Sequence, residues 1–163
     1  MSIMAWTAVI LAEGKGTRMA SCKPKALQML AGRTLIGHVL NTLDNLNIDE
    51  AVIIHYTKAK SDFEEELIGH KNITYVEQKE ALGTANALKT ALPHVSTDNL
   101  LVLLGDVPLL SEFTISKLQE EIKKNDLVIL TGTVDNPSGL SLIHISEPTR
   151  LLSIGDGGVC VKK

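Results

Sequence analysis

The chain has 163 residues, of which 44% are hydrophobic and 21% charged, and these values predict one globular domain with a core of its own. The net charge of −3 at pH 7 gives no general attraction to nucleic acid, so no nucleic-acid partner is expected. The two cysteines, Cys22 and Cys160, match neither a disulfide framework nor a metal-binding motif, which favours a reducing, cytoplasmic location. No apolar run approaches the ~20 residues of a membrane-spanning helix and no signal peptide is recognisable, so no membrane partner is expected.

Apolar runs of strand length alternate along the chain with segments of helical periodicity. In chain order, the pattern predicts a strand at 6–12, a helix at 34–43, a strand at 51–55, a helix at 61–68, a strand at 73–76, a helix at 84–92, a strand at 100–104, a helix at 111–124 and a strand at 127–134. Continuous apolar runs are typical of strands buried on both faces of a parallel sheet. The alternation predicts a Rossmann-like, doubly wound, mostly parallel α/β fold with ligands at the carboxyl ends of the strands.

The first motif follows the first strand. Gly14 and Gly16 allow close approach of the backbone to a ligand, and Thr17, Arg18 and Lys25 add a hydroxyl and two cations. The loop lacks the third glycine of a dinucleotide fingerprint and the Gly-Lys-Ser/Thr of a P-loop. Solvated loop charges remain an alternative, but the convergence of these residues behind one strand predicts a polyphosphate site.

The second motif is Gly105-Asp106-Val107-Pro108, at the end of the predicted strand 100–104. A carboxylate at this edge of the sheet is where Mg²⁺ on a nucleotide phosphate would be held. Asp106 would alternatively cap the next turn. Ser111 is the better cap for the following helix, which leaves Asp106 available for metal.

The third motif combines Gln78 with Gly83 and Thr84, which open a predicted helix. The amide of Gln78 offers a donor and an acceptor, as a pyrimidine edge requires. Taken alone, the motif is better explained as the capped start of a helix than as a ligand site.

Residues 140–163 lack the strand and helix rhythm of the preceding chain. The string 141–150 (SLIHISEPTR) resembles a translated sequencing adaptor. We therefore expect two parts, a partial nucleotidyltransferase domain at 1–139 and a foreign tail at 140–163. A genuine irregular tail is the alternative.

Together, the three motifs resemble those of the nucleotidyltransferases that make sugar nucleotides. The chain is most similar to the uridyltransferase half of the bacterial bifunctional N-acetylglucosamine-1-phosphate uridyltransferases/glucosamine-1-phosphate acetyltransferases. The resemblance covers about residues 6–139 and lies in Leu11-Ala12-x-Gly14-x-Gly16-Thr17-Arg18-Met19, Pro24-Lys25, Leu30-Ala31-Gly32, His38-Val39, Gln78, Leu82-Gly83-Thr84-Ala85, Gly105-Asp106-Val107-Pro108-Leu109 and Asn136-Pro137-Ser138-Gly139.

The resemblance implies a nucleotide-diphospho-sugar transferase fold, incomplete at its C-terminus. It implies that UTP and N-acetylglucosamine 1-phosphate form pyrophosphate and UDP-N-acetylglucosamine, a precursor of peptidoglycan and lipopolysaccharide. The implied catalytic residues are Arg18 and Lys25, which would hold the triphosphate, and Asp106, which would bind the cofactor Mg²⁺. The implied substrate-binding residues are Leu11, Ala12, Gly14, Gly16 and Thr17 in the first loop, Gln78, Gly83 and Thr84 around uracil, and Gly105 beside the nucleoside.

Three departures from the family pattern bear on activity. Glu13 stands where the family usually has alanine, and a carboxylate there would repel a triphosphate unless it points away or is paired. Leu140 replaces the start of the family's Tyr-Gly-Arg. The family's sugar-binding residues, a second metal ligand and the acetyltransferase domain through which the parent is expected to form a homotrimer have no counterpart. We therefore expect weak activity of this chain alone. A different NTP transferase, such as a molybdenum-cofactor guanylyltransferase, and a non-enzymatic nucleotide-binding module remain alternatives.

Overall fold

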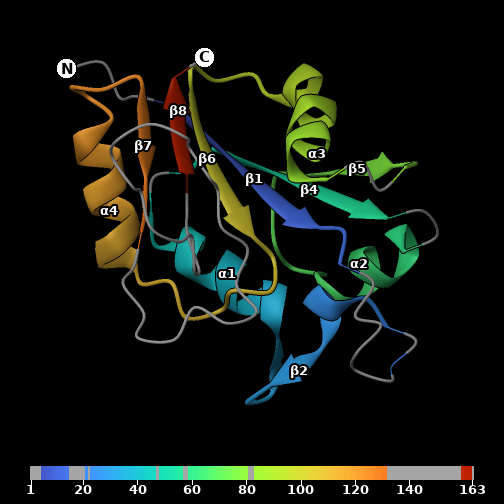
Figure 1. Cartoon of the computed structure of the whole chain (residues 1–163). Helices are drawn as coiled ribbons and strands as arrows, with labels where there is room; N and C mark the ends of the chain where they lie inside the picture. Colours follow the sequence, from blue (N-terminus) through green and yellow to red (C-terminus); the bar gives the residue numbers. More distant parts are fainter. Residues whose placement is uncertain are drawn as a thin grey trace, which may run out of the picture.

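A computed structural model describes residues 5–14, 21, 23–46, 48–56, 59–80 and 83–131, together with the backbone of 159–162. Helices lie on both faces of a central six-stranded sheet (Figure 1). The elements are β1 (Trp6–Ala12), η2 (Lys25–Leu27), β2 (Met29–Leu30), β3 (Arg33–Thr34), α1 (Leu35–Asp44), β4 (Glu50–Tyr56), α2 (Lys60–Glu66), β5 (Ile73–Gln78), α3 (Thr84–Ala91), η3 (Leu92–His94), β6 (Asn99–Leu104), α4 (Glu112–Glu121), β7 (Leu127–Ile129) and β8 (Val159–Lys162). No helix among the described residues has the length and hydrophobicity that would let it cross a bilayer.

The strand order in the sheet is β5-β4-β1-β6-β8-β7. Strands β5, β4, β1 and β6 run parallel to one another, and β8 runs antiparallel to both β6 and β7. The prediction of a doubly wound, mostly parallel sheet is therefore confirmed. All seven residues of β1 are buried, because the strand lies between two other strands and between two layers of helices.

Two apolar clusters hold the layers together, and the alternation of β1 supplies both. Ile10 and its neighbours on one side of β1 join Ile36 of α1, Phe63 of α2 and Ile115 of α4. Val9 and Leu11 on the other side join Ala87 and Ala91 of α3. Helices α1, α2 and α4 thus cover one face of the sheet, and α3 covers the other.

The order of the strands places a switch point between β1 and β6. From β1 the chain moves outward to β4 and then β5, and it returns to β6 on the opposite side of β1. Connections on the two sides of a switch point diverge, which leaves a crevice at the carboxyl ends of the strands. Each of the first two sequence motifs follows one of these two strands.

Helix capping follows the sequence at two positions. Thr34 Oγ1 accepts a hydrogen bond from the Gly37 N–H at 3.1 Å, and Ser111 Oγ accepts one from the Thr114 N–H at 3.2 Å. The predicted cap at Ser111 is therefore confirmed. Asp106 takes no part in starting α4.

Three features differ from the sequence prediction. Strands β2 and β3 form a short hairpin with a two-residue turn. Both turn residues, Ala31 (φ 49°) and Gly32 (φ 84°), have positive φ. The strand predicted at 127–134 ends at Ile129, and its part beyond 131 lies outside the described residues. Strand β8 comes from the segment that was expected to add no element, because its short valine-rich run fits between β6 and β7.

Candidate functional site

The candidate site lies where β1 and β6 end side by side. Leu11 pairs with Leu104 in the sheet, and the Gly105 N–H donates to the Leu11 carbonyl at 2.9 Å, which extends this pairing by one residue. Asp106 follows directly. The backbone of β6 therefore fixes Asp106 beside the loop that follows β1.

The close approach of these segments favours glycine at position 105. A Cβ atom at this position would lie 3.2 Å from Ala12 Cβ, 3.3 Å from the Leu11 carbonyl oxygen and 3.4 Å from Ala26 Cβ. Two of these contacts are tighter than ordinary van der Waals contact, and one involves backbone that cannot rotate away. The glycine thus lets β6 end against β1 and η2, which brings Asp106 to the switch point.

Lys25 reaches the same point from the other side. It is the first residue of η2, and its backbone N–H donates to the Gly14 carbonyl at 3.0 Å. The aliphatic part of its side chain lies near Gly14, at whose position a Cβ atom would be 3.7 Å from Lys25 Cβ. The first loop and η2 are thereby joined next to the end of β1.

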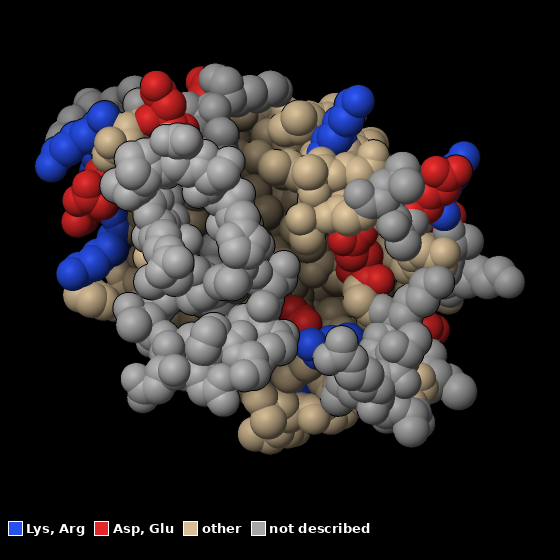
Figure 2. Space-filling view, viewed as in Figure 1, with Lys and Arg blue, Asp and Glu red and all other residues tan. Residues whose placement is uncertain are grey.

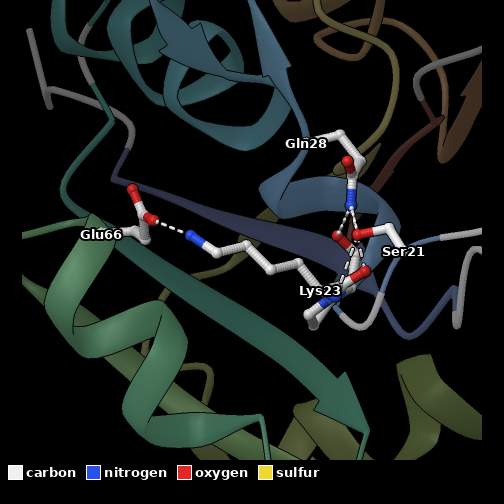
Figure 3. A network of polar contacts seen from close by, with 5 residues as sticks. Ser21, Lys23, Gln28 and Glu66 are labelled. Carbon is white, nitrogen blue, oxygen red and sulfur yellow. Dashed lines mark hydrogen bonds and ion pairs between the residues drawn. The ribbon is translucent and has the colours of Figure 1, made fainter.

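A polar network formed by residues on both sides of Lys25 in the sequence anchors this segment (Figure 3). Gln28 Nε2 donates to Ser21 Oγ at 2.9 Å and to the Lys23 carbonyl at 3.1 Å. Lys23 Nζ pairs with Glu66 Oε1 of α2 at 2.6 Å. The hydrogen bonds from Gln28 fold the segment back on itself, and the ion pair ties it to α2.

Lys25 and Asp106 form an ion pair across the site. Lys25 Nζ lies 2.5 Å from Asp106 Oδ2, and the two side chains are 44% and 29% exposed. The residues are far apart in sequence and meet because β1 and β6 are neighbours. A cation and a carboxylate in contact at a switch point form a pair that can separate to bind a phosphate and a metal ion.

These residues surround a pocket of about 180 Å³. Its walls include six residues that the sequence analysis assigned to the site, together with Glu13, Ala26 and Leu104; the six are Leu11, Ala12, Gly14, Lys25, Thr84 and Asp106. The pocket is smaller than the ~300–1,000 Å³ of complete ligand sites, so it fits part of a nucleotide. Two larger hollows, of about 310 and 390 Å³, lie along α1 and the turn after α2 and contain none of the predicted site residues.

Gln78 ends β5 and does not line this pocket. Its side chain is 1% exposed, and neither its amide nitrogen nor its amide oxygen has a hydrogen-bond partner among the described residues. A buried polar group without a partner costs about 1–3 kcal/mol of stability. Such a group is therefore a candidate for a ligand contact.

The segment around Gly83 opens α3 as predicted. Gly83 has φ +89°, which favours glycine, and its carbonyl accepts from the Asn86 and Ala87 N–H groups at 3.1 Å. Thr84 lines the pocket, whereas Gly83 does not. The third motif thus contributes one side chain to the pocket directly.

The sequence analysis noted Glu13 only as a departure from the family pattern and did not assign it to the site. Glu13 is one of the residues that line the pocket, and burial raises the pKa of its carboxyl group. Oxygen Oε2 is buried and has no hydrogen-bond partner among the described residues. The predicted site residues Gly16, Thr17 and Arg18 lie outside the described residues.

The donor set at Asp106 suits one kind of metal ion. The described residues contain no group of three His, Cys, Asp or Glu side chains that could form a complete metal site. Mg²⁺ is commonly bound by one or two carboxylates together with water and substrate phosphates. A single partly exposed carboxylate beside the pocket fits that pattern.

Charges elsewhere on the visible face are mixed. Among the described residues on the face shown in Figure 2, lysines and arginines are interspersed with aspartates and glutamates and form no continuous patch. Attraction of an anionic ligand thus depends on local groups such as Lys25.

The model of the MobA-like NTP transferase domain matches residues 8–151. The Bifunctional protein GlmU of Francisella philomiragia is 46% identical over 176 residues, which cover 98% of this chain and 38% of that protein. Bifunctional protein GlmU of Francisella tularensis subsp. novicida is 44% identical over 140 residues, covering 86% of this chain and 30% of that protein. The chain therefore spans less than two fifths of the length of these curated relatives.

Solved structures share the fold. A 4-diphosphocytidyl-2C-methyl-D-erythritol synthase from Anaerococcus prevotii has a TM-score of 0.72 at 18% identity and covers 98% of this chain and 70% of that one. The complex of Rv0371C from Mycobacterium tuberculosis with manganese has a TM-score of 0.63 at 20% identity, covering 76% of this chain and 62% of that one.

Proposed function

This chain belongs to the MobA-like NTP transferase family, and from that premise we propose that it is the nucleotide-binding part of a uridyltransferase. The proposed reaction joins UTP and N-acetylglucosamine 1-phosphate into UDP-N-acetylglucosamine and pyrophosphate. Similarity to two GlmU proteins supports this choice of substrates. The structural observation that carries the proposal is the Lys25–Asp106 ion pair beside the pocket at the switch point.

In this reaction a phosphate oxygen of the sugar phosphate attacks the α-phosphorus of UTP in line, and pyrophosphate leaves. Positioning and charge neutralisation supply most of the catalysis in such a transfer. We assign Lys25 and Arg18 to the triphosphate oxygens and Asp106 to Mg²⁺. When bound, Mg²⁺ would neutralise phosphate charge, and the guanidinium fork of Arg18 suits a group with several oxygens.

The remaining roles concern the nucleoside. We assign Gly14, Gly16 and Thr17, with the backbone of Leu11 and Ala12, to the nucleotide beside the first loop. The buried, unpartnered amide of Gln78 supports a contact with uracil. Gly83 and Thr84 complete the uracil site, and Gly105 lies against the nucleoside.

Nucleotide selectivity tests the proposal most simply. We expect the chain to bind UTP with Mg²⁺ about tenfold or more tightly than CTP or GTP in titration calorimetry, because a site that hydrogen-bonds a base disfavours analogues that leave its groups unpaired. Preference for GTP would assign the chain to a different NTP transferase.

Turnover requires a second measurement. Joining this chain to the remainder of the Francisella philomiragia GlmU gives a protein in which pyrophosphate release can be followed with N-acetylglucosamine 1-phosphate. We expect release that depends on both substrates. UTP binding without release would favour a non-enzymatic binding module.

Two further parts of the proposal concern the whole protein. We propose that it acts in the cytoplasm and forms a homotrimer through a domain outside this chain, which sedimentation of the whole protein would test. That residues 140–163 are foreign also stays a prediction; apart from β8 they lie outside the described residues. An independent read of the gene across codon 139 that returned the same codons would contradict it.

A further inference from the structure

The Lys25–Asp106 ion pair places an ammonium group at the oxygen that a metal ion would need. Lys25 Nζ is 2.5 Å from Asp106 Oδ2, and among the described residues Asp106 has no other ion-pair partner. Backbone hydrogen bonds fix both ends, from Lys25 to Gly14 and from Gly105 to Leu11. The fold therefore holds the backbones of these two segments side by side, so that the Lys25 and Asp106 side chains can meet.

A free divalent ion gains little at this place. It would have to displace the ammonium of Lys25, and it would gain a single carboxylate, because the described residues offer no group of three metal-binding side chains. The displaced ammonium would then lie next to a dication. Two like charges at contact distance repel, and the repulsion is stronger where the groups are partly buried.

The electrostatic interactions are different for a metal ion that is already bound to a nucleotide. The ion can take Asp106 while the ammonium of Lys25 turns to the phosphate oxygens, so that each charge exchanges one opposite partner for another. Lys25 has room for this movement, because its side chain is 44% exposed and its stem runs beside Gly14, which has no side chain to block it.

We propose that Lys25 occupies the metal position at Asp106 while the nucleotide is absent and moves to the phosphates when a metal–nucleotide complex binds. The site thus excludes free divalent ions and admits the ion together with its nucleotide. Lys25 then controls the access of metal ions to Asp106 and also binds the phosphates. The inference rests on the proposed function for the identity of the nucleotide, whereas its first step concerns the metal ion alone.

Binding of Mn²⁺ without nucleotide tests the first step. The free ion can be followed by electron paramagnetic resonance with the full chain and with the Lys25→Met, Lys25→Arg and Asp106→Asn variants. Removal of the competing charge in Lys25→Met should raise Mn²⁺ affinity about tenfold, whereas Lys25→Arg should stay close to wild type. Asp106→Asn should abolish the gain when combined with Lys25→Met. The gain should shrink as ionic strength rises, because both groups are partly exposed.

Addition of UTP tests the second step. In its presence the order should reverse, with Lys25→Met binding Mn²⁺ and UTP more weakly than wild type. The inference would be overturned if, without nucleotide, the Lys25→Met variant bound Mn²⁺ no more tightly than the wild type. Lys25→Gln provides the same test if the methionine variant fails to fold, as judged by its melting curve. Failure of the proposed function would instead show as wild-type chain with no preference for UTP, which leaves the metal-only result intact.

Discussion

Polar groups at the amino ends of the central strands differ from those at the carboxyl ends in whether they have partners within the protein. At the amino ends, the polar groups are paired within the protein. Thr7 Oγ1 donates to Glu50 Oε1, which also accepts from the Ser96 N–H at 2.9 Å. Thr97 Oγ1 lies 2.8 Å from Thr7 Oγ1, and Asn99 Nδ2 donates to the Ala5 carbonyl at 3.1 Å.

At the carboxyl ends, polar groups are left without partners or paired in a way that can be exchanged. The amide of Gln78 and one oxygen of Glu13 are buried without a partner among the described residues. Lys25 and Asp106 are paired but partly exposed. The same strands therefore gain stability at one end and keep binding capacity at the other, as expected where function competes with stability.

Asp106→Asn should have the largest effect on activity. It removes the carboxylate that we assign to the metal ion and should lower turnover by about 10² or more, the order seen for other charge-stabilising groups. The melting temperature should change little, because the ion pair is partly exposed. Pyrophosphate release and a melting curve on the same preparation measure both. Turnover within a few-fold of wild type would remove Asp106 from the site.

Glu50→Gln is the matching change at the amino ends. It should destabilise the fold by about 1–2 kcal/mol, because charge-assisted hydrogen bonds from Thr7 and Ser96 are replaced by neutral ones. Urea unfolding measures this free energy. UTP binding, corrected for the folded fraction, should be unaffected.

The pH dependence of that change has a definite sign. Burial alone would raise the pKa of Glu50, but hydrogen bonds from Thr7 and Ser96 outweigh it and lower the pKa below the ordinary 4.5. A carboxyl with a lowered pKa contributes stability above its unfolded value and loses that contribution as pH falls through the folded value. The difference between wild type and Glu50→Gln should therefore be full above about pH 5 and shrink below pH 4.5. A constant difference across this range would contradict the assigned hydrogen bonds.

Replacing an amide side chain by leucine at each end of the strands gives a direct contrast. Gln78→Leu removes a buried amide without partners, so stability should stay equal or rise by about 1 kcal/mol while UTP affinity falls. Asn99→Leu leaves the Ala5 carbonyl unpaired and should cost about 1–2 kcal/mol with UTP affinity unchanged. Equal destabilisation by both changes would show that Gln78 is structural.

Glu13→Gln should have the smallest effect. Burial raises the pKa of the Glu13 carboxyl group, and Glu13 is one of the residues that line the pocket assigned to phosphates. Neutralising it should increase UTP affinity by roughly two- to fivefold at pH 7.5, with less gain near pH 5.5, where more of the wild-type side chain is protonated. Calorimetry at the two pH values measures the difference. Weaker UTP binding by the variant would show that Glu13 supports the site.

Local signals in the sequence predicted the framework well. The continuous apolar run Trp6–Ala12 gave β1 with its observed bounds, and Ser111 gave the start of α4. Helix capping and burial on both faces leave a strong local pattern. The turn at Ala31 was not predictable in this way, because alanine rarely adopts positive φ.

Contacts between distant segments were beyond the sequence. Lys25 and Asp106 were each assigned to the site, but their pairing depends on β6 returning beside β1, which no local pattern specifies. The burial of Gln78 and of one Glu13 oxygen likewise depends on the packing of several segments. Strand β8 was not predicted because residues 140–163 were interpreted as a foreign tail, and a run of four residues is too short to show a recognisable period.

Chemical-shift mapping tests most directly whether UTP binds at the carboxyl ends of the central strands and not at their amino ends. Backbone amide spectra of the ¹⁵N-labelled chain are recorded with Mg²⁺ alone and then with Mg²⁺ and UTP. We expect the amides of Gly14, Lys25, Thr84 and Asp106 to shift with UTP, while the amino-end network around Glu50 stays in place. Shifts confined to the amino ends or to the hollows along α1, or no shifts at millimolar UTP, would contradict a nucleotide site at the switch point.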